Sequence, residues 1–358
     1  MIGWQGSSLR FGNDVGGFLR NAYLALKKEV TSPFLPEWTV AMFAYRESPE
    51  ILAQSIRALL KAVGRSTAID VIVNGNEFLA VEAARFVDSL KLDGHGCLVS
   101  LRIWHVAQGD KAHAWNQYLY GIWEGAEMAF FVDGYVRVHP DALRKMSDAM
   151  SRDNHALAAT GVPSQGSSAL NMKTRILAEH GLHGNLHVIR GMTLEELRKR
   201  KFILPLGIYR TDSLIGAAMK FNLDPVRYGW DSQRIHVVAD ASWDHTPLSI
   251  AKPSDWAAHF KRMMRQGQGV FENLAIRRHL GIESQPLGAL PETACELANV
   301  WMKNHPQECL AALLKQPLAV FSLNRIRRSR DWSDAAIPPR LLIQNIKHAP
   351  KDAVVHQS

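Results

Sequence analysis

Polar and charged side chains stand where the apolar, strand-like runs of this sequence end. Tyr45 and Glu47 follow the first run, Asn74 ends the second, Lys111 comes shortly after the third, and Asp133 interrupts the fourth. Charge at the tip of an apolar strand costs free energy unless it meets a partner. In an open parallel sheet, ligands bind outside the carboxyl ends of the strands. The pattern therefore predicts a binding site for a polar ligand at that edge of a sheet.

Two common phosphate-binding loops are absent from the sequence. No G-x-G-x-x-G follows the first apolar run, and no G-x-x-x-x-G-K-[ST] occurs anywhere. These loops bind the phosphates of dinucleotides and of nucleoside triphosphates. The sequence therefore gives little support to a dinucleotide-dependent oxidoreductase or a P-loop enzyme.

Strand-like and helix-like segments alternate along the first half of the chain. Strands are predicted at 38–44, 68–73, 97–106, 128–138 and 156–162, with helices at about 50–63, 78–90, 111–123 and 142–150. Such alternation is typical of a parallel sheet covered by helices on both faces.

The remaining segments give weaker patterns. A helix is predicted at 19–30, before a proline-rich linker that ends at residue 36. The polar segment 164–201 is not assigned. Strand character returns at 204–214 and 234–239, the pattern is helical beyond Pro253, and the sequence from Asp331 resembles a tail.

Composition limits the class of protein. Of the 358 residues, 47% are hydrophobic, which is typical of a folded globular chain. Lys and Arg number 42 against 34 Asp and Glu, a net charge of +8. This basicity indicates an anionic partner: nucleic acid, a phosphorylated small molecule or an acidic membrane.

Two further absences bear on location. No segment reaches the length of about 18 uncharged apolar residues that a membrane-spanning helix needs, and the N-terminus does not resemble a secretory signal. The three scattered cysteines are too few for a disulfide framework or a four-ligand zinc site. The sequence therefore predicts a cytoplasmic protein, with peripheral attachment to the inner face of the membrane as an option.

Four segments together resemble the nucleotide-sugar half of family 2 glycosyltransferases with the GT-A fold. They are 43–47 (FAYRE), 74–76 (NGN), 111–116 (KAHAWN) and 131–135 (FVDGY), and the similarity runs in family order from about Glu37 to His245. The resemblance implies an α/β fold with a mostly parallel, GT-A-like central sheet, helices on both faces, an N-terminal helix and a C-terminal helical extension. It divides the chain into an N-terminal extension and linker (1–36), a catalytic domain (37–250), a basic helical region (251–330) and a tail (331–358).

The resemblance also assigns a donor-binding role to particular residues. Tyr45, Glu47 and Asn74 would line the nucleoside pocket, and Lys111 would approach the donor. The family usually has an Asp where this chain has Asn74. An amide can still accept from a uracil N–H and donate to a carbonyl, so a UDP-linked donor is favoured.

Metal binding is where this chain departs from the family. Asp133 matches the first acid of the D-x-D element, but Tyr135 occupies the later position. A neutral phenol is a poor ligand for Mg²⁺ or Mn²⁺. In the first reading, which we favour slightly, Asp133 and His245 still hold the cation. In the second, protein cations neutralise the diphosphate, and the candidates are Lys111, Arg137, Arg262 and Arg265.

A second acidic element lies further along the chain. The segment 229–231 (GWD) resembles the family's x-E-D element, with Trp230 in place of the first acid. In an inverting transfer a carboxylate takes the proton of the attacking hydroxyl, and Asp231 would be this base. Trp230, Arg262 and Arg265 would lie on the acceptor or diphosphate side. The same Gly-Trp-Asp-Ser segment is also good helix-capping chemistry.

Two clusters allow other functions. The basic cluster of Arg325, Arg327, Arg328 and Arg330 follows an apolar stretch, so it could rest on an anionic membrane. His180, His183 and His187 have a spacing that would share one helix face and could bind zinc, although two glycines weaken such a helix.

These observations predict an inverting glycosyltransferase that moves a sugar from a nucleoside diphosphate to a hydroxyl of a glycan or glycolipid. The alternative is a non-catalytic module of the same fold that binds a nucleotide sugar or a glycan, because Tyr135 and Trp230 replace two expected acids. Nucleic acid is not an expected partner, because the charge is scattered and no motif for reading nucleic acid occurs.

Overall fold

The computed structural model describes residues 20–21, 23–24, 36–90, 97–164, 169–245, 253–315, 319–328 and 330–347, without the side chains of 253–264, 319 and 347. The predicted N-terminal helix at 19–30 and the linker after it lie almost entirely outside these residues.

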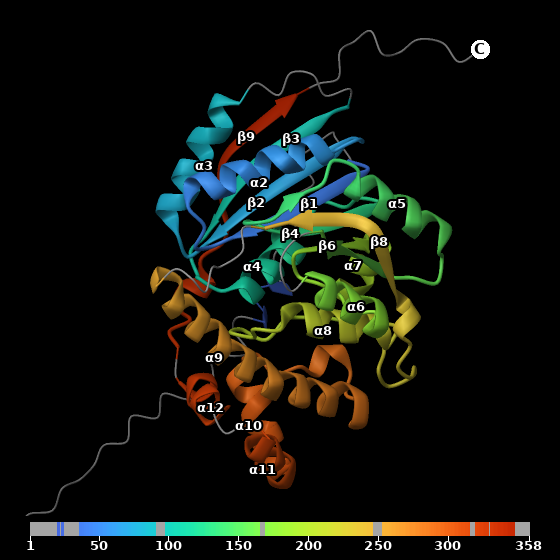
Figure 1. Cartoon of the computed structure of the whole chain (residues 1–358), viewed down its shortest axis with the longest axis vertical. Helices are drawn as coiled ribbons and strands as arrows, with labels where there is room; N and C mark the ends of the chain where they lie inside the picture. The colour runs from blue at the N-terminus through green and yellow to red at the C-terminus, as the bar shows by residue number, and fades with distance from the viewer. Residues whose placement is uncertain are drawn as a thin grey trace, which may run out of the picture.

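One nine-stranded sheet runs through the described part of the chain, in the order β5-β8-β6-β7-β4-β1-β2-β3-β9 (Figure 1). Its strands are β1 (Trp38–Ala44), β2 (Thr67–Asn74), β3 (Val99–Val106), β4 (Met128–Asp133), β5 (Arg137–Val138), β6 (Ala158–Pro163), β7 (Leu186–Arg190), β8 (Ile235–Asp244) and β9 (Arg340–Lys347). Only β5, β7 and β9 run against the other six strands. The prediction of an α/β fold with a mostly parallel sheet is confirmed.

The central strands are buried on both sides because they are almost continuously apolar. Alternate side chains of β1 enter two separate cores, Val40 and Met42 on one face and Ala41 and Phe43 on the other. Parallel strands with both faces covered need such unbroken apolar runs.

The register of the central strands brings their polar ends together. Ala44 of β1 pairs with Val73 of β2, and Phe43 pairs with Asp133 of β4. The side chains that follow these pairs therefore lie at one edge of the sheet, as the sequence predicts.

Helices cover the two faces unequally. The first face carries α2 (Pro49–Ala62), α3 (Glu77–Ser89) and α5 (Ala142–Arg152). The other face carries α4 (Lys111–Gln117), α7 (Gly191–Lys199), α8 (Thr211–Lys220), α9 (Pro253–Ile276), α10 (Ala294–Asn304) and α12 (Ala319–Arg327). In Figure 1 the segments α9 to α12, with α11 (Pro306–Lys315), gather on this second side. No helix of the described residues is long and apolar enough to cross a membrane.

Helix capping positions the polar loops at the carboxyl edge. Asn76 caps α3 by accepting the N–H of Leu79 at 3.1 Å, and Asp110 caps α4 by accepting that of His113 at 2.9 Å. Each cap satisfies a backbone donor that the first turn of a helix leaves unpaired. The two loops therefore enter their helices in fixed orientations.

Three predictions for the second half of the chain are wrong or incomplete. The predicted strand at 204–214 is a loop whose Leu206 forms a single bridge with Thr293, followed by the start of α8 at Thr211. Pro205 lacks a backbone donor and Gly207 has φ of +79°, so a regular strand cannot continue there. The unassigned segment 164–201 contains α6 (Ala169–Glu179), β7 and α7.

The prediction of a tail from Asp331 is wrong for β9. This strand pairs antiparallel with β3 and covers the edge of the sheet. An uncovered edge strand would expose a row of unpaired backbone groups.

Candidate active site

The carboxyl ends of β1, β2 and β4 open into a cleft of about 2750 Å³. Loops after these strands form one wall, and the first turn of α8, together with α9 and α12, forms the other. The cleft is therefore enclosed between the sheet and the C-terminal helices.

The floor of the cleft is formed where two glycine loops touch. Gly75 has φ of +64°, and a Cβ at this position would collide with the backbone of Gly109. The ring of Tyr45 lies 3.3 Å from the place where a Cβ would stand on either glycine. Only glycine permits this packing at position 75, and a Cβ on Gly109 would crowd the ring of Tyr45. The ring of Tyr45 therefore packs against Gly75 and Gly109 at the predicted nucleoside pocket.

Asn74 and Glu47 brace this floor as well as lining the cleft. Asn74 is buried and donates to the carbonyl of Ala44 at 2.9 Å. One oxygen of Glu47 accepts the backbone N–H groups of Tyr45 at 2.6 Å and Arg46 at 2.9 Å. Burial raises the pKa of Glu47, these hydrogen bonds oppose the rise, and the charge of Asp133 adds to it. Both residues stand where the sequence predicts.

An ion pair between Asp133 and Lys111 occupies the centre of the cleft. The ammonium of Lys111, at the first position of α4, contacts one carboxylate oxygen of Asp133. Burial would lower the pKa of Lys111, but the charge and hydrogen bond of Asp133 outweigh it and raise that pKa. Lys111 is therefore a cation, and it neutralises the acid that the sequence identifies as central.

Tyr135 contacts the other oxygen of the same carboxylate. Its hydroxyl lies 3.1 Å from that oxygen and 3.0 Å from the amide oxygen of Asn185. Burial and the charge of Asp133 raise the pKa of Tyr135 well above its usual range. The phenol therefore stays neutral and donates a hydrogen bond to the Asp133 carboxylate.

Asp212 lies beside this ion pair and is not among the site residues predicted from the sequence. It lines the cleft from the first turn of α8. A Cβ on Gly184 would lie 3.5 Å from the Lys111 ammonium and 3.8 Å from a carboxylate oxygen of Asp212. One oxygen of Asp212 accepts the N–H of Ser213 at 3.0 Å. The signal was present in the sequence, because Thr-Asp-Ser before an apolar run is a helix start.

The residues around Asp133 do not fit a divalent cation. The carboxylate is already engaged by an ammonium and a phenol. The ring centroid of His245 lies 6.2 Å from that of Tyr135, the phenol that contacts Asp133. Among the described side chains, no three His, Cys, Asp or Glu residues come together in a group that could hold a metal ion. The predicted pairing of Asp133 with His245 as metal ligands therefore lacks the donor set that a hard cation prefers.

The predicted shared helix face of His180, His183 and His187 is wrong. The helix α6 ends at Glu179, and His187 belongs to β7, where it stacks on Phe131 at 4.9 Å between ring centroids.

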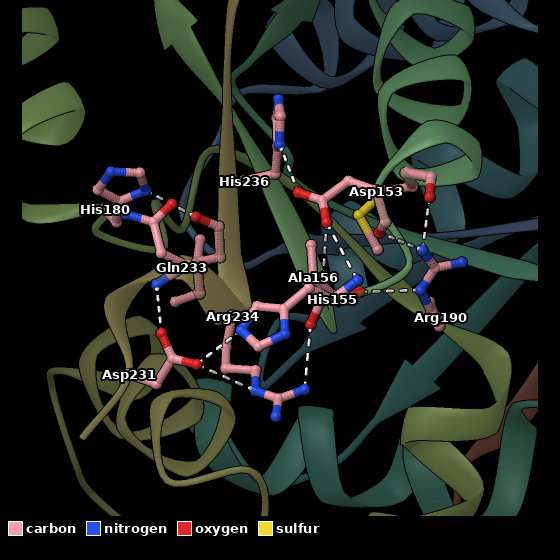
Figure 2. Close-up of polar contacts among 11 residues, drawn as sticks. Asp153, His155, Ala156, His180, Arg190, Asp231, Gln233, Arg234 and His236 are labelled. Carbon is pink, nitrogen blue, oxygen red and sulfur yellow. Dashed lines mark hydrogen bonds and ion pairs between the residues drawn. The ribbon is translucent and has the colours of Figure 1, made fainter. Parts of the chain in front are cut away.

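Asp231, which the sequence predicts as the general base, makes its contacts outside the cleft. Its neighbours Trp230 and Ser232 line the cleft, but Asp231 does not. Figure 2 shows its carboxylate directed at His155 and Arg234, whose nitrogens lie 2.6 Å and 3.4 Å away. It also accepts the N–H of Gln233 at 3.0 Å at the start of a short helix. The capping interpretation of this segment is therefore the one that the structure supports.

The protonation of Asp231 agrees with a structural role. Partial burial would raise its pKa, but the hydrogen bonds from His155 and Gln233 lower it below its usual range. A lower pKa makes a carboxylate a weaker base. Neither its position nor its basicity suits proton abstraction in the cleft.

The other predicted residues divide between the cleft and its surroundings. Trp230 lines the cleft, is 57% exposed and packs edge-on against Phe221. Arg265 also lines the cleft. Arg137 lies in β5, paired in register with Asp244, and is not among the lining residues. The side chain of Arg262 lies outside the described residues, and only its backbone is placed, within α9.

Two polar residues of α9 hold the loop that precedes Asp212. Glu272 accepts the N–H groups of Tyr209 and Arg210 at 2.9 Å, and Gln268 donates to the carbonyl of Gly207 at 3.3 Å. These contacts attach the C-terminal helices to the loop that starts α8. They therefore fix the position of Asp212 relative to the sheet.

Glu272 is expected to make stability depend on pH. Burial raises its pKa from 4.5 to about 7, against the opposing hydrogen bonds. The folded chain then binds more protons than the unfolded chain between these values, so stability falls as the pH rises through this range. We expect the free energy of unfolding in urea to fall between about pH 5 and about pH 8, and to fall less in a Glu272→Gln variant. Equal slopes in the two proteins would contradict this assignment.

Comparisons with known proteins bear on the fold. No protein-family model matches the chain, and no curated protein sequence matches it. Among solved structures, it resembles a mannosyltransferase from Pyrobaculum calidifontis in complex with GDP-Man and Mn²⁺. The TM-score is 0.52 at 16% sequence identity, and the match covers 89% of this chain and 84% of the other. The chain therefore has the same kind of α/β fold as this mannosyltransferase.

Proposed function

We propose that this protein is a glycosyltransferase that moves a sugar from a nucleoside diphosphate donor to a hydroxyl group, with inversion at the anomeric carbon. The observation that carries the proposal is the Lys111–Asp133 ion pair at the carboxyl edge of the sheet, between a floor built on Tyr45 and the carboxylate of Asp212. This arrangement offers a ring-binding surface, a cation for a diphosphate and a base within one cleft. The shared fold with a mannosyltransferase supports it.

Asp212 replaces Asp231 as the proposed general base. An inverting transfer needs a carboxylate close to the acceptor hydroxyl, on the opposite side of the sugar from the leaving diphosphate. Asp212 lines the cleft from the first turn of α8, and Trp230 offers an aromatic surface for a sugar in the same cleft. Among the other cleft carboxylates, Glu47 and Asp110 each accept two backbone N–H groups, and Asp133 and Glu179 form ion pairs, whereas Asp212 accepts the N–H of Ser213.

Nucleotide binding tests the proposal most directly. Calorimetry with UDP and with GDP, each with and without Mn²⁺, should detect binding of at least one nucleotide. UDP is favoured by the amide of Asn74, and GDP is included because the mannosyltransferase was in complex with GDP-Man. Failure of both nucleotides in all four conditions would overturn the proposal.

Tyr135 keeps a second function open, a non-catalytic module that binds a nucleotide sugar. The phenol replaces an acid at the centre of the cleft. Release of UDP or GDP from the matching sugar nucleotides by purified protein separates the two functions, because a binding module would release neither.

The acceptor is proposed to be a glycolipid at an anionic membrane. Apolar side chains at the surface of α11 and α12 include Leu314, 73% exposed, and Phe321, 60% exposed, and the exposed Arg328 follows them. Such a mixture suits an interface with anionic lipid. We expect the protein to float with vesicles containing phosphatidylglycerol and not with neutral phosphatidylcholine vesicles. A Leu314→Ser/Phe321→Ser variant should float several-fold less, and unchanged flotation would contradict this role.

A further inference from the structure

Arginines from distant parts of the chain meet at the cleft. They are Arg46 after β1, Arg265 in α9, Arg325 in α12, and Arg328 and Arg330 just beyond it, and we call them the arginine cluster. The helices α9 and α12 pack against each other, which brings the C-terminal members next to the loop after β1. The cluster therefore depends on tertiary packing and not on one basic segment.

No arginine of the cluster forms an ion pair among the described residues. The arginine ion pairs found there involve other residues, such as Arg102, Arg200, Arg234 and Arg278. Asp110 lies close to Arg330: burial raises the pKa of Asp110, and the charge of Arg330 opposes that rise. Burial lowers the pKa of Arg325, and the charges of Arg265, Arg330 and Arg46 lower it further. Like charges held close together cost free energy that a bound anion would offset.

The cluster adjoins the ion pair at the centre of the cleft. A Cβ on Gly207 would lie 3.2 Å from the guanidinium of Arg330, and the N–H of Gly207 donates to Asp110 at 3.0 Å. Asp110 precedes Lys111 directly in the chain. The guanidinium groups and the Lys111 ammonium therefore belong to one basic region of the cleft.

We propose that this region neutralises the donor's diphosphate with protein cations and that the reaction needs no divalent metal, although the mannosyltransferase of similar fold is in complex with Mn²⁺. The proposal rests on the proposed function and defines the electrostatics of the same site. It stands on two observations: the donor set around Asp133 does not fit a metal, and five arginines that form no ion pair among the described residues line the same cleft. Arginine is suited to this role because its planar guanidinium binds phosphate oxygens in pairs.

Each charged group has a role in the bond changes of the proposed sugar transfer. The bond between the anomeric carbon and the diphosphate oxygen breaks, and its electron pair stays on the diphosphate. The acceptor oxygen forms the new bond to the anomeric carbon, and its proton passes to Asp212. Lys111 and the arginine cluster stabilise the negative charge that gathers on the leaving group.

Calorimetry in EDTA and in Mn²⁺ tests the proposal. We expect UDP or GDP to bind with Kd values that agree within about threefold in the two conditions, since no metal bridge contributes. Binding that requires Mn²⁺ would overturn this inference and leave the proposed function intact. Absence of binding in both conditions would overturn both.

Arg325→Gln and Arg327→Gln form a matched pair of variants. Arg325 lines the cleft, whereas Arg327, two residues further in the same helix, points at the sulfur of Met302, 3.8 Å away. A charged hydrogen bond contributes about 1.5–3 kcal/mol, so Arg325→Gln should weaken nucleotide binding in EDTA by about tenfold to a hundredfold. Arg327→Gln should leave Kd unchanged. Equal Kd values for the two variants would contradict a role for the arginine cluster.

Tyr135→Asp tests the same inference in the opposite direction. This change adds a carboxylate beside Asp133, in the position that the phenol now occupies. We expect the variant to bind nucleotide more weakly in EDTA and to recover affinity with Mn²⁺, in contrast to the unchanged protein. A metal response that is the same in both proteins would contradict the substitution of protein cations for a metal.

Discussion

An Asp212→Asn variant is expected to lose sugar transfer almost completely, with kcat lower by about 10²–10⁴-fold, the usual contribution of a general base. The amide keeps the size of the side chain and can still accept the N–H of Ser213, now 3.0 Å from the carboxylate. It cannot take the proton of the acceptor hydroxyl. Donor turnover measured as UDP or GDP release would show the loss, and calorimetry should show a nucleotide Kd within a few-fold of that of the unchanged protein.

Asp231→Asn is the matched control for this experiment. It makes the same chemical change nineteen positions further along the chain, but at a carboxylate that faces His155 and Arg234 outside the cleft. We expect kcat to stay within a few-fold of its original value. A large loss in Asp231→Asn with normal turnover in Asp212→Asn would restore the assignment made from sequence and contradict the one made from structure.

The strand ends of the site were accessible from the sequence because they depend on local patterns. A nearly unbroken apolar run followed by a polar residue is enough to place Tyr45, Asn74 and Asp133 at one edge, once the strands are parallel. The register then brings Phe43 beside Asp133. No knowledge of the distant parts of the chain is needed for this step.

The base could not be chosen in the same way. Asp212 lies in the first turn of α8 and Asp231 caps a short helix, so both acids stand at the start of a helix. The difference between them is the direction in which each carboxylate points, and this depends on His155, which lies 76 residues away from Asp231. A single sequence contains no record of that contact.

The sequence predicts only part of the arginine cluster. The run from Arg325 to Arg330 stands out as a basic segment, and a membrane was the natural partner for it. Only the packing of α12 against α9 shows that Arg325 lines the cleft. Within one turn of the same helix, Arg327 points elsewhere. The sequence therefore shows where charges stand along the chain. It does not show which surface of the folded protein they line.

A buried ion pair behind the site carries the largest expected effect on stability. Asp70 of β2 is fully buried, and its carboxylate binds the guanidinium of Arg102 of β3 at 2.6 Å and 3.0 Å. Trp104 donates to the same carboxylate at 2.8 Å, and Glu124 lies 3.1 Å from Arg102. Burial would lower the pKa of Arg102, but the charges of Asp70 and Glu124 raise it. The pair joins the strands whose ends carry Asn74 and the Gly109 loop.

Asp70→Ala should therefore lower the free energy of unfolding by about 3–5 kcal/mol, because it leaves the guanidinium buried with one carboxylate fewer. An Asp70→Leu/Arg102→Met variant removes both charges and replaces them with apolar side chains. Such exchanges of a buried pair are often close to neutral, so we expect the double variant to be clearly more stable than Asp70→Ala in urea titrations. If both variants lost the same stability, packing and not the buried charge would be the cause. If Asp70→Ala lost less than about 1 kcal/mol, which is the value of an exposed pair, the ion pair would be irrelevant to the sheet. The expected order instead makes this pair the contact that holds β2 and β3 in register behind the candidate site.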